Sequence, residues 1–130
     1  ARQRRVDALH IHDLSAEQRA SYSGDWTAVQ ERFVDTPAEA VSAAGTLIWD
    51  VMRDSGYPAD DRNASQEALS YLHAQSFEGY RQAQDLRLET ATTEELRAAM
   101  IRYRALFEDL TGPNNGQGQP GRNLTADKPR

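Results

Sequence analysis

The chain has 130 residues, of which 38% are hydrophobic, no cysteine, and a formal net charge of −5. This length suits one domain, and the lack of cysteine excludes disulfides, thiolate metal ligands and cysteine nucleophiles. Between positions 6 and 121 the sequence holds 19 acidic residues against 9 arginines. Because such an acidic body repels phosphate backbones, we expect no binding of nucleic acid.

A first helix is predicted from Ser15. Ser15 and Gln18 have the spacing of a capping box, which satisfies two free backbone N–H groups at a helix start. The apolar residues that follow recur at three- and four-residue steps on one face: Tyr22, Trp26, Val29 and Phe33. Gly24 lies inside this segment and is expected to weaken or kink the helix.

A second helix is predicted from Thr36. Thr36 and Glu39 form another expected capping box, and Pro37 stands at the first helical position, where its missing N–H costs nothing. Gly56 and Pro58 mark the end. The very short connection around Thr36 predicts either antiparallel neighbours or a sharp corner. The expected inner face consists of Val41, Ala44, Leu47, Ile48, Val51 and Met52.

The third helical segment has a ragged apolar pattern. Asn63 with Gln66 is the expected cap, and the segment runs to about Leu88. One long helix and two shorter helices broken near His73–Ser76 are both compatible with the pattern. Its candidate core residues are Leu69, Leu72, Phe77, Tyr80 and Leu86.

The last helix has the clearest start and stop signals. Thr92 and Glu95 form a capping box, Gly112 is expected to take the left-handed conformation after the helix, and Pro113 cannot continue it. One apolar stripe runs along it: Leu96, Ala99, Met100, Tyr103, Leu106, Phe107 and Leu110. This stripe has to be buried, so the sequence predicts a packed helical domain.

Together these segments predict an all-α domain over residues 14–112, a small bundle of three to four helices with disordered termini. Residues 1–13 are expected to be a flexible basic segment. Residues 113–130 are rich in Gly and Pro and almost without apolar side chains, so we expect a disordered tail.

Two sequence motifs, taken together and in this order, are specific enough to indicate a protein family. The first is W-x-x-V-Q-x-x-F-V-D-x-P, formed by Trp26, Val29, Gln30, Phe33, Val34, Asp35 and Pro37. The second is R-x-A-M-x-x-Y-R-x-L-F, formed by Arg97, Ala99, Met100, Tyr103, Arg104, Leu106 and Phe107. In this order, and over roughly Val6 to Leu110, the chain resembles a family of small actinobacterial proteins of unknown function.

The resemblance implies architecture rather than activity. Members of this family have one N-terminal transmembrane helix, a basic charged linker, and this helical domain on the cytoplasmic side. The chain departs from the family where a His-Pro turn precedes the segment that Tyr80 and Arg81 match, because no proline stands there. No catalytic motif is carried over. The anchor would lie upstream of this chain, and the arginines at positions 2, 4 and 5 are either part of its linker or a solvated tail.

The sequence offers little reactive chemistry. A metal site could be formed by His10, His12 and Asp13, and His73 is the one histidine left to complete it. Ordinary solvated histidines are the simpler interpretation. The acids near Asp60 lack the spacing of a calcium loop. No serine nucleophile motif or glycine-rich phosphate loop is found. We therefore assign no catalytic residue, metal or cofactor and expect a protein that is not an enzyme.

Three aromatic residues are candidate contacts for a partner or ligand: Trp26, Trp49 and Tyr103. Core packing is the ordinary role of such residues, but Trp49 lies about 80° from the centre of its helix's apolar stripe, at about 100° per residue, and could anchor a partner. The leading hypothesis is a non-enzymatic protein-interaction domain, tethered to the cytoplasmic face of the membrane, with an unknown protein partner. The alternative is a small-molecule-binding domain whose pocket these aromatics line; a filled core would remove it.

Overall fold

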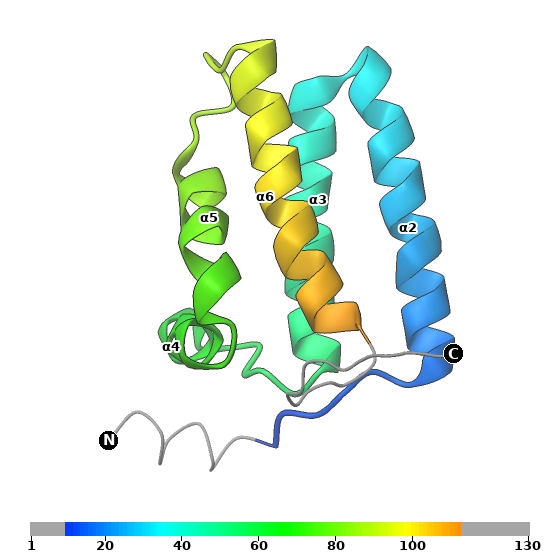
Figure 1. Ribbon diagram of the computed structural model, residues 1–130, viewed down its shortest axis with the longest axis vertical. Coiled ribbons are helices and arrows are strands. Elements are labelled where there is room, and N and C mark those ends of the chain that lie inside the picture. Colours follow the sequence, from blue (N-terminus) through cyan, green and yellow to red (C-terminus); the bar gives the residue numbers. More distant parts are fainter. Residues whose placement is uncertain (1–9, 113–130) are drawn as a thin grey trace, which may run out of the picture.

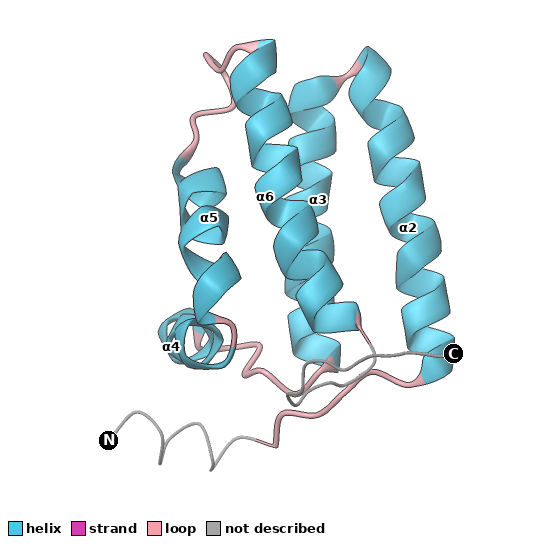
Figure 2. Ribbon diagram, viewed as in Figure 1, coloured by secondary structure: helices cyan, strands magenta, loops and turns pink. Residues whose placement is uncertain are grey.

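The computed structural model describes residues 10–112, and in this range the chain forms five α-helices and no strand (Figures 1 and 2). The predicted all-α class is confirmed. The helices are α2 (Ala16–Asp35), α3 (Pro37–Asp54), α4 (Arg62–Leu72), α5 (Ala74–Asp85) and α6 (Thr93–Thr111). Their number exceeds the expected three to four because the third predicted segment forms two helices. The predicted tail 113–130 and positions 1–9 lie outside the described residues.

The three long helices α2, α3 and α6 stand side by side, and α5 packs against α6 on the side away from α2 (Figure 1). The connection between α2 and α3 is the single residue Thr36, and the two helices run antiparallel, as one of the two expected arrangements. The short helix α4 crosses one end of the assembly and contacts α5. None of the helices within residues 10–112 has the length and apolar composition needed to cross a membrane.

The core lies between the apolar faces that the sequence pattern predicts. All six predicted residues of α3 and all seven of α6 are buried. On α2, Trp26 and Val29 are buried, and Tyr22 and Phe33 pack against the core with part of their surface exposed. Burial of each large apolar side chain contributes about 1.5–3 kcal/mol, so these faces are the main source of stability.

Two of the predicted capping boxes are confirmed. The Ser15 hydroxyl accepts the Gln18 backbone N–H at 3.0 Å, and the Gln18 side chain accepts the Ser15 N–H at 3.0 Å. Thr92 and Glu95 exchange the equivalent pair of hydrogen bonds at the start of α6. Helix α2 continues through Gly24 without a break.

The predicted capping box at Thr36 is wrong. The Thr36 side chain makes no cap hydrogen bond to α3; its hydroxyl instead donates to the Arg32 carbonyl at 3.2 Å. With one connecting residue, Thr36 is both the last cap of α2 and the first of α3, and its side chain serves the preceding helix. Glu39 forms an ion pair with Arg32 at 3.2 Å.

The third predicted segment is corrected in three ways. Its cap is Asp61, whose carboxylate accepts the Ala64 N–H at 3.0 Å, and not Asn63, which lies in the first turn of α4. The backbone breaks at His73 between α4 and α5, so the two-helix alternative holds. Leu72, expected in the core, is 41% exposed. Of the other predicted core residues, Leu69 and Tyr80 are buried, and Phe77 and Leu86 are partly buried.

The prediction that Gly112 takes the left-handed conformation after α6 is also wrong. Gly112 has φ −65° and ψ 154°, an extended conformation, and its N–H donates to the Glu108 carbonyl at 2.9 Å. Among the described residues, the glycine with positive φ is Gly56, at 95°, in the turn after α3. The chain from His10 crosses this turn, and the His12 N–H donates to the Ser55 carbonyl at 2.8 Å. We call residues 10–14 the strap.

Candidate functional site

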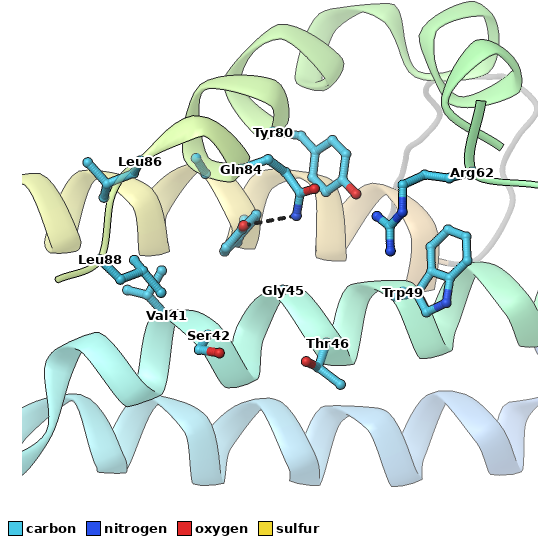
Figure 3. Close-up of a pocket in the computed structure, with 12 residues that line it drawn as sticks. Val41, Ser42, Gly45, Thr46, Trp49, Arg62, Tyr80, Gln84, Leu86 and Leu88 are labelled. Carbon is cyan, nitrogen blue, oxygen red and sulfur yellow. Dashed lines mark hydrogen bonds between the residues drawn. The ribbon is translucent and has the colours of Figure 1, made fainter. Parts of the chain in front are cut away.

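The described part of the chain contains a pocket of about 330 Å³ between α3, α5 and the segment that leads from α5 to α6 (Figure 3). This volume lies at the small end of the range found for ligand pockets. Twelve residues line it: Val41, Ser42, Gly45, Thr46, Trp49, Arg62, Tyr80, Ala83, Gln84, Leu86, Leu88 and Tyr103.

The pocket exists because α3 and α5 both pack on α6 and leave space between themselves. The principal helix contacts are α3 with α6 and α5 with α6. Gly45, on the pocket side of α3, allows the Tyr103 side chain of α6 to approach closely. A Cβ atom at Gly45 would lie 3.2 Å from the Tyr103 hydroxyl oxygen. The floor of the pocket is therefore formed by a tyrosine from α6 seated against a glycine of α3.

A cation stands at one end of the pocket. The Arg62 guanidinium carbon lies 4.7 Å from the centroid of the Trp49 ring, a cation–π arrangement. Arg62 forms no ion pair with any residue in the range 10–112. The neighbouring Asp61 carboxylate is occupied as the cap of α4. The charge of Arg62 thus faces the pocket mouth without a carboxylate partner from the described chain.

Two tyrosines and an amide form the middle of the pocket. The Gln84 side-chain amide donates to the Tyr103 hydroxyl at 3.1 Å, drawn as a dashed line in Figure 3. The rings of Tyr80 and Tyr103 lie 6.0 Å apart. Burial raises the pKa of Tyr80 to about 12, with a further rise from Tyr103 and an opposing effect of Arg62. Burial also raises the pKa of Tyr103. Both hydroxyls therefore keep their protons at neutral pH and can donate hydrogen bonds.

The other end of the pocket is mainly aliphatic, with the Ser42 hydroxyl beside Val41. Figure 3 shows Val41, Leu86 and Leu88 gathered at the end opposite Arg62 and Trp49. None of the twelve lining residues is acidic. The pocket therefore changes along its length from a cation, through neutral hydrogen-bonding groups, to aliphatic side chains.

The structure separates the three aromatic residues proposed from the sequence. Trp49 and Tyr103 line the same pocket, and Trp49 is partly buried. Trp26 is 6% exposed on α2 and stacks on Phe107, with ring centroids 4.8 Å apart and an interplanar angle of 17°. Its indole N–H is buried without a hydrogen-bond partner. Trp26 is thus a core residue and does not line this pocket.

Sequence reasoning missed Arg62 and Gln84 and assigned Tyr80 only to the core. These three residues meet because the chain breaks at His73, which no pattern in the sequence located uniquely. The one local signal was Gly45, since a glycine on the apolar side of a helix often marks a close approach of another group. That signal would have led to Tyr103 but not to Arg62.

The histidines and acids considered from the sequence have other surroundings. Within residues 10–112, no three histidine, aspartate or glutamate side chains gather in a group able to hold a metal ion. His73 lies 4.0 Å from Asp109, and burial lowers the pKa of its ring while Asp109 opposes this shift. Asp54 accepts a hydrogen bond from the Tyr22 hydroxyl at 2.5 Å and lies 3.7 Å from Arg53.

No protein-family model, curated protein or solved structure matches this chain.

Proposed function

We propose that this domain is a non-enzymatic ligand-binding domain and that the pocket between α3 and α5 is its binding site. The observation that carries the proposal is Arg62, stacked on Trp49 at the mouth of an open pocket and unpaired with any described carboxylate. Arg62 is exposed, so its charge is accessible to a ligand that enters the pocket. The cavity lined by Trp49 and Tyr103 moves the ligand-binding hypothesis ahead of the interaction hypothesis that the sequence favoured.

The lining also supports binding rather than catalysis. Its polar groups are hydroxyls, one amide and one guanidinium. The tyrosine hydroxyls hold their protons far above neutral pH, and a guanidinium is always protonated. A general acid or base works best with a pKa near the working pH, so these groups are suited to hold and orient a ligand.

The proposal is tested by ¹H–¹⁵N NMR of the labelled domain with a library of small amphiphilic compounds. We expect binders to shift the indole N–H signal of Trp49 and the side-chain amide signals of Gln84. The indole signal of Trp26 is an internal control, because that ring is buried against Phe107. A library in which no compound moves the Trp49 and Gln84 signals would contradict the proposal.

A pocket-blocking variant provides a second control. Thr46 is an exposed residue of the lining, so Thr46→Trp should fill the space and abolish the shifts at Gln84. Thr27→Trp places the same side chain on an exposed position of α2, away from the pocket, and should leave binding unchanged. Equal binding by both variants would place the compounds elsewhere.

A second candidate function is docking of a protein partner at the cytoplasmic face of the membrane. It is favoured by Ile101, which is 63% exposed on α6 and stands at helical spacing from Ala98 and Ala105. The Ile101→Glu variant should lose a partner that the unmodified domain retains from native membranes. Identical partner recovery by both proteins would remove this surface from consideration.

The tether belongs to this second proposal. It rests on the resemblance to the membrane-anchored actinobacterial family and on the arginines at positions 2, 4 and 5. The upstream coding sequence decides it: an apolar stretch of about 20 residues before a basic linker supports a tether. Without such a stretch the tether falls, and the ligand-binding proposal is unaffected.

A further inference from the structure

We infer that the pocket binds a monocarboxylate with an aliphatic tail, its carboxylate on Arg62 and its tail between Leu86 and Leu88. This inference rests on the proposed ligand-binding function and specifies the chemical class of the ligand. It is carried by the order of side chains along the pocket, which runs from cation to aliphatic end (Figure 3).

Arg62 is placed to receive a carboxylate. The Arg62 guanidinium carbon lies 4.7 Å from the Trp49 ring centroid, and the N–H groups of a guanidinium lie in its plane, where they can bind both oxygens of a carboxylate. The nearest acid in the sequence, Asp61, caps α4 through the Ala64 N–H. Arg62 is the one cation among the twelve lining residues, so the pocket matches a head group with a single negative charge.

Tyr80 supplies a second donor at the same end. Its side chain is 1% exposed, and its hydroxyl points toward Arg62 in Figure 3. No other described residue forms a hydrogen bond with this hydroxyl. The hydroxyl oxygen is not among the fully buried described atoms that lack a partner, so it is open to the pocket and can donate to a ligand. A carboxylate held by Arg62 would accept the Tyr80 hydrogen as well.

The remaining length of the pocket fits an aliphatic chain. Val41 and Trp49 stand eight residues apart on α3, a rise of about 12 Å, and both line the pocket. The end away from Arg62 carries Val41, Leu86 and Leu88, with the Ser42 hydroxyl beside Val41 and no charged group for a second charged end of a ligand. An acid of the size of octanoate spans this distance.

The test compares three probes with one tail and different head groups: octanoate, octanol and octylammonium. Each is titrated into the labelled domain below its aggregation limit, and the Trp49 indole and Gln84 amide signals give the affinity. We expect octanoate to bind at least tenfold more tightly than octanol, and octylammonium to bind no better than octanol. The Trp26 indole signal should not move with any probe.

Two arginine variants provide the matched comparison. Arg62→Gln should lower the affinity for octanoate at least tenfold, to that of octanol, and leave octanol binding unchanged. Arg81→Gln removes an exposed arginine of α5 that does not line the pocket and should change neither affinity. Circular dichroism of each variant confirms that the fold is retained. Arg62→Glu, which reverses the charge, should make octylammonium the preferred probe.

The outcomes separate the inference from the proposed function. Equal affinity for octanoate and octanol, or an unchanged octanoate affinity in Arg62→Gln, overturns the inference while the pocket remains a binding site. If none of the three probes moves the Trp49 signal but an unrelated compound does, the ligand class is wrong. If no compound of any class moves it, the proposed function fails together with the inference.

Discussion

Two of the helical glycines, Gly24 and Gly45, differ in what a methyl group would meet. At Gly24 an added Cβ lies in open space, whereas at Gly45 it would lie 3.2 Å from the Tyr103 hydroxyl oxygen. Gly24→Ala should raise the free energy of unfolding by about 0.5–1 kcal/mol, the ordinary gain from alanine inside a helix. Gly45→Ala should gain clearly less, because Tyr103 has to move. Chemical denaturation of both variants measures the difference, and an equal gain would contradict the close approach at Gly45.

His73 predicts a pH dependence of stability. Burial lowers the pKa of its ring below the ordinary value of 6.5, although Asp109 partly opposes the shift. As the pH falls through about 6.5, the unfolded chain takes up a proton before the folded chain does, so the free energy of unfolding decreases. His73→Gln should therefore lose less stability than the unmodified protein between about pH 7 and pH 5. Denaturation curves over this range test it, and parallel pH profiles would disprove the effect.

At the scale of the helix, the N-terminus of α4 is capped by Asp61 and not by the predicted residue, Asn63. The Asp61 carboxylate accepts the Ala64 N–H, whereas Asn63 makes no such contact. Asp61→Ala should destabilise the protein by about 1 kcal/mol. Asn63→Ala should have a much smaller effect, since position 63 is exposed in the first turn. The two variants are compared by thermal unfolding, and a larger loss for Asn63→Ala would restore the cap expected from the sequence.

Sequence patterns predicted helices well where one local rule acted alone. The boxes at Ser15 and Thr92 formed because each of these residues is itself extended and caps only one helix. Thr36 failed because one residue had to serve two helix ends, and its hydroxyl bonded to the preceding helix. The buried faces of α3 and α6 followed from periodicity alone. The pocket could not be predicted from periodicity, because Arg62, Gln84 and Tyr103 come from three helices whose packing no local pattern encodes.

At the scale of the molecule, the helices divide into a long group and a short pair. Helices α2, α3 and α6 have 20, 18 and 19 residues, whereas α4 and α5 have 11 and 12. Helices this short are marginal without tertiary contacts, and the principal contacts of the pair with the long group run through α6. We therefore expect α4 and α5 to open more readily than the rest of the domain.

Amide hydrogen exchange measures this difference directly. Exchange should be fastest in α4 and α5 and slowest in the buried halves of α3 and α6. A ligand in the pocket should slow exchange in α5 most, because α5 forms one wall while α3 is already held by α2 and α6. Uniform protection over all five helices would show that the short pair unfolds only with the whole domain.

The strap sets the end of the bundle at which the described chain begins. It crosses the turn at Gly56, where a side chain would collide with the His10 carbonyl, so the chain enters at the end of the bundle where α4 lies (Figure 1). Arg62 opens α4 at this same end. In a protein tethered through a short linker, the mouth that we propose binds a carboxylate would face the lipid surface, and the aliphatic end would face away. An amphiphilic acid leaving the bilayer would then have to enter the mouth tail first to place its carboxylate on Arg62.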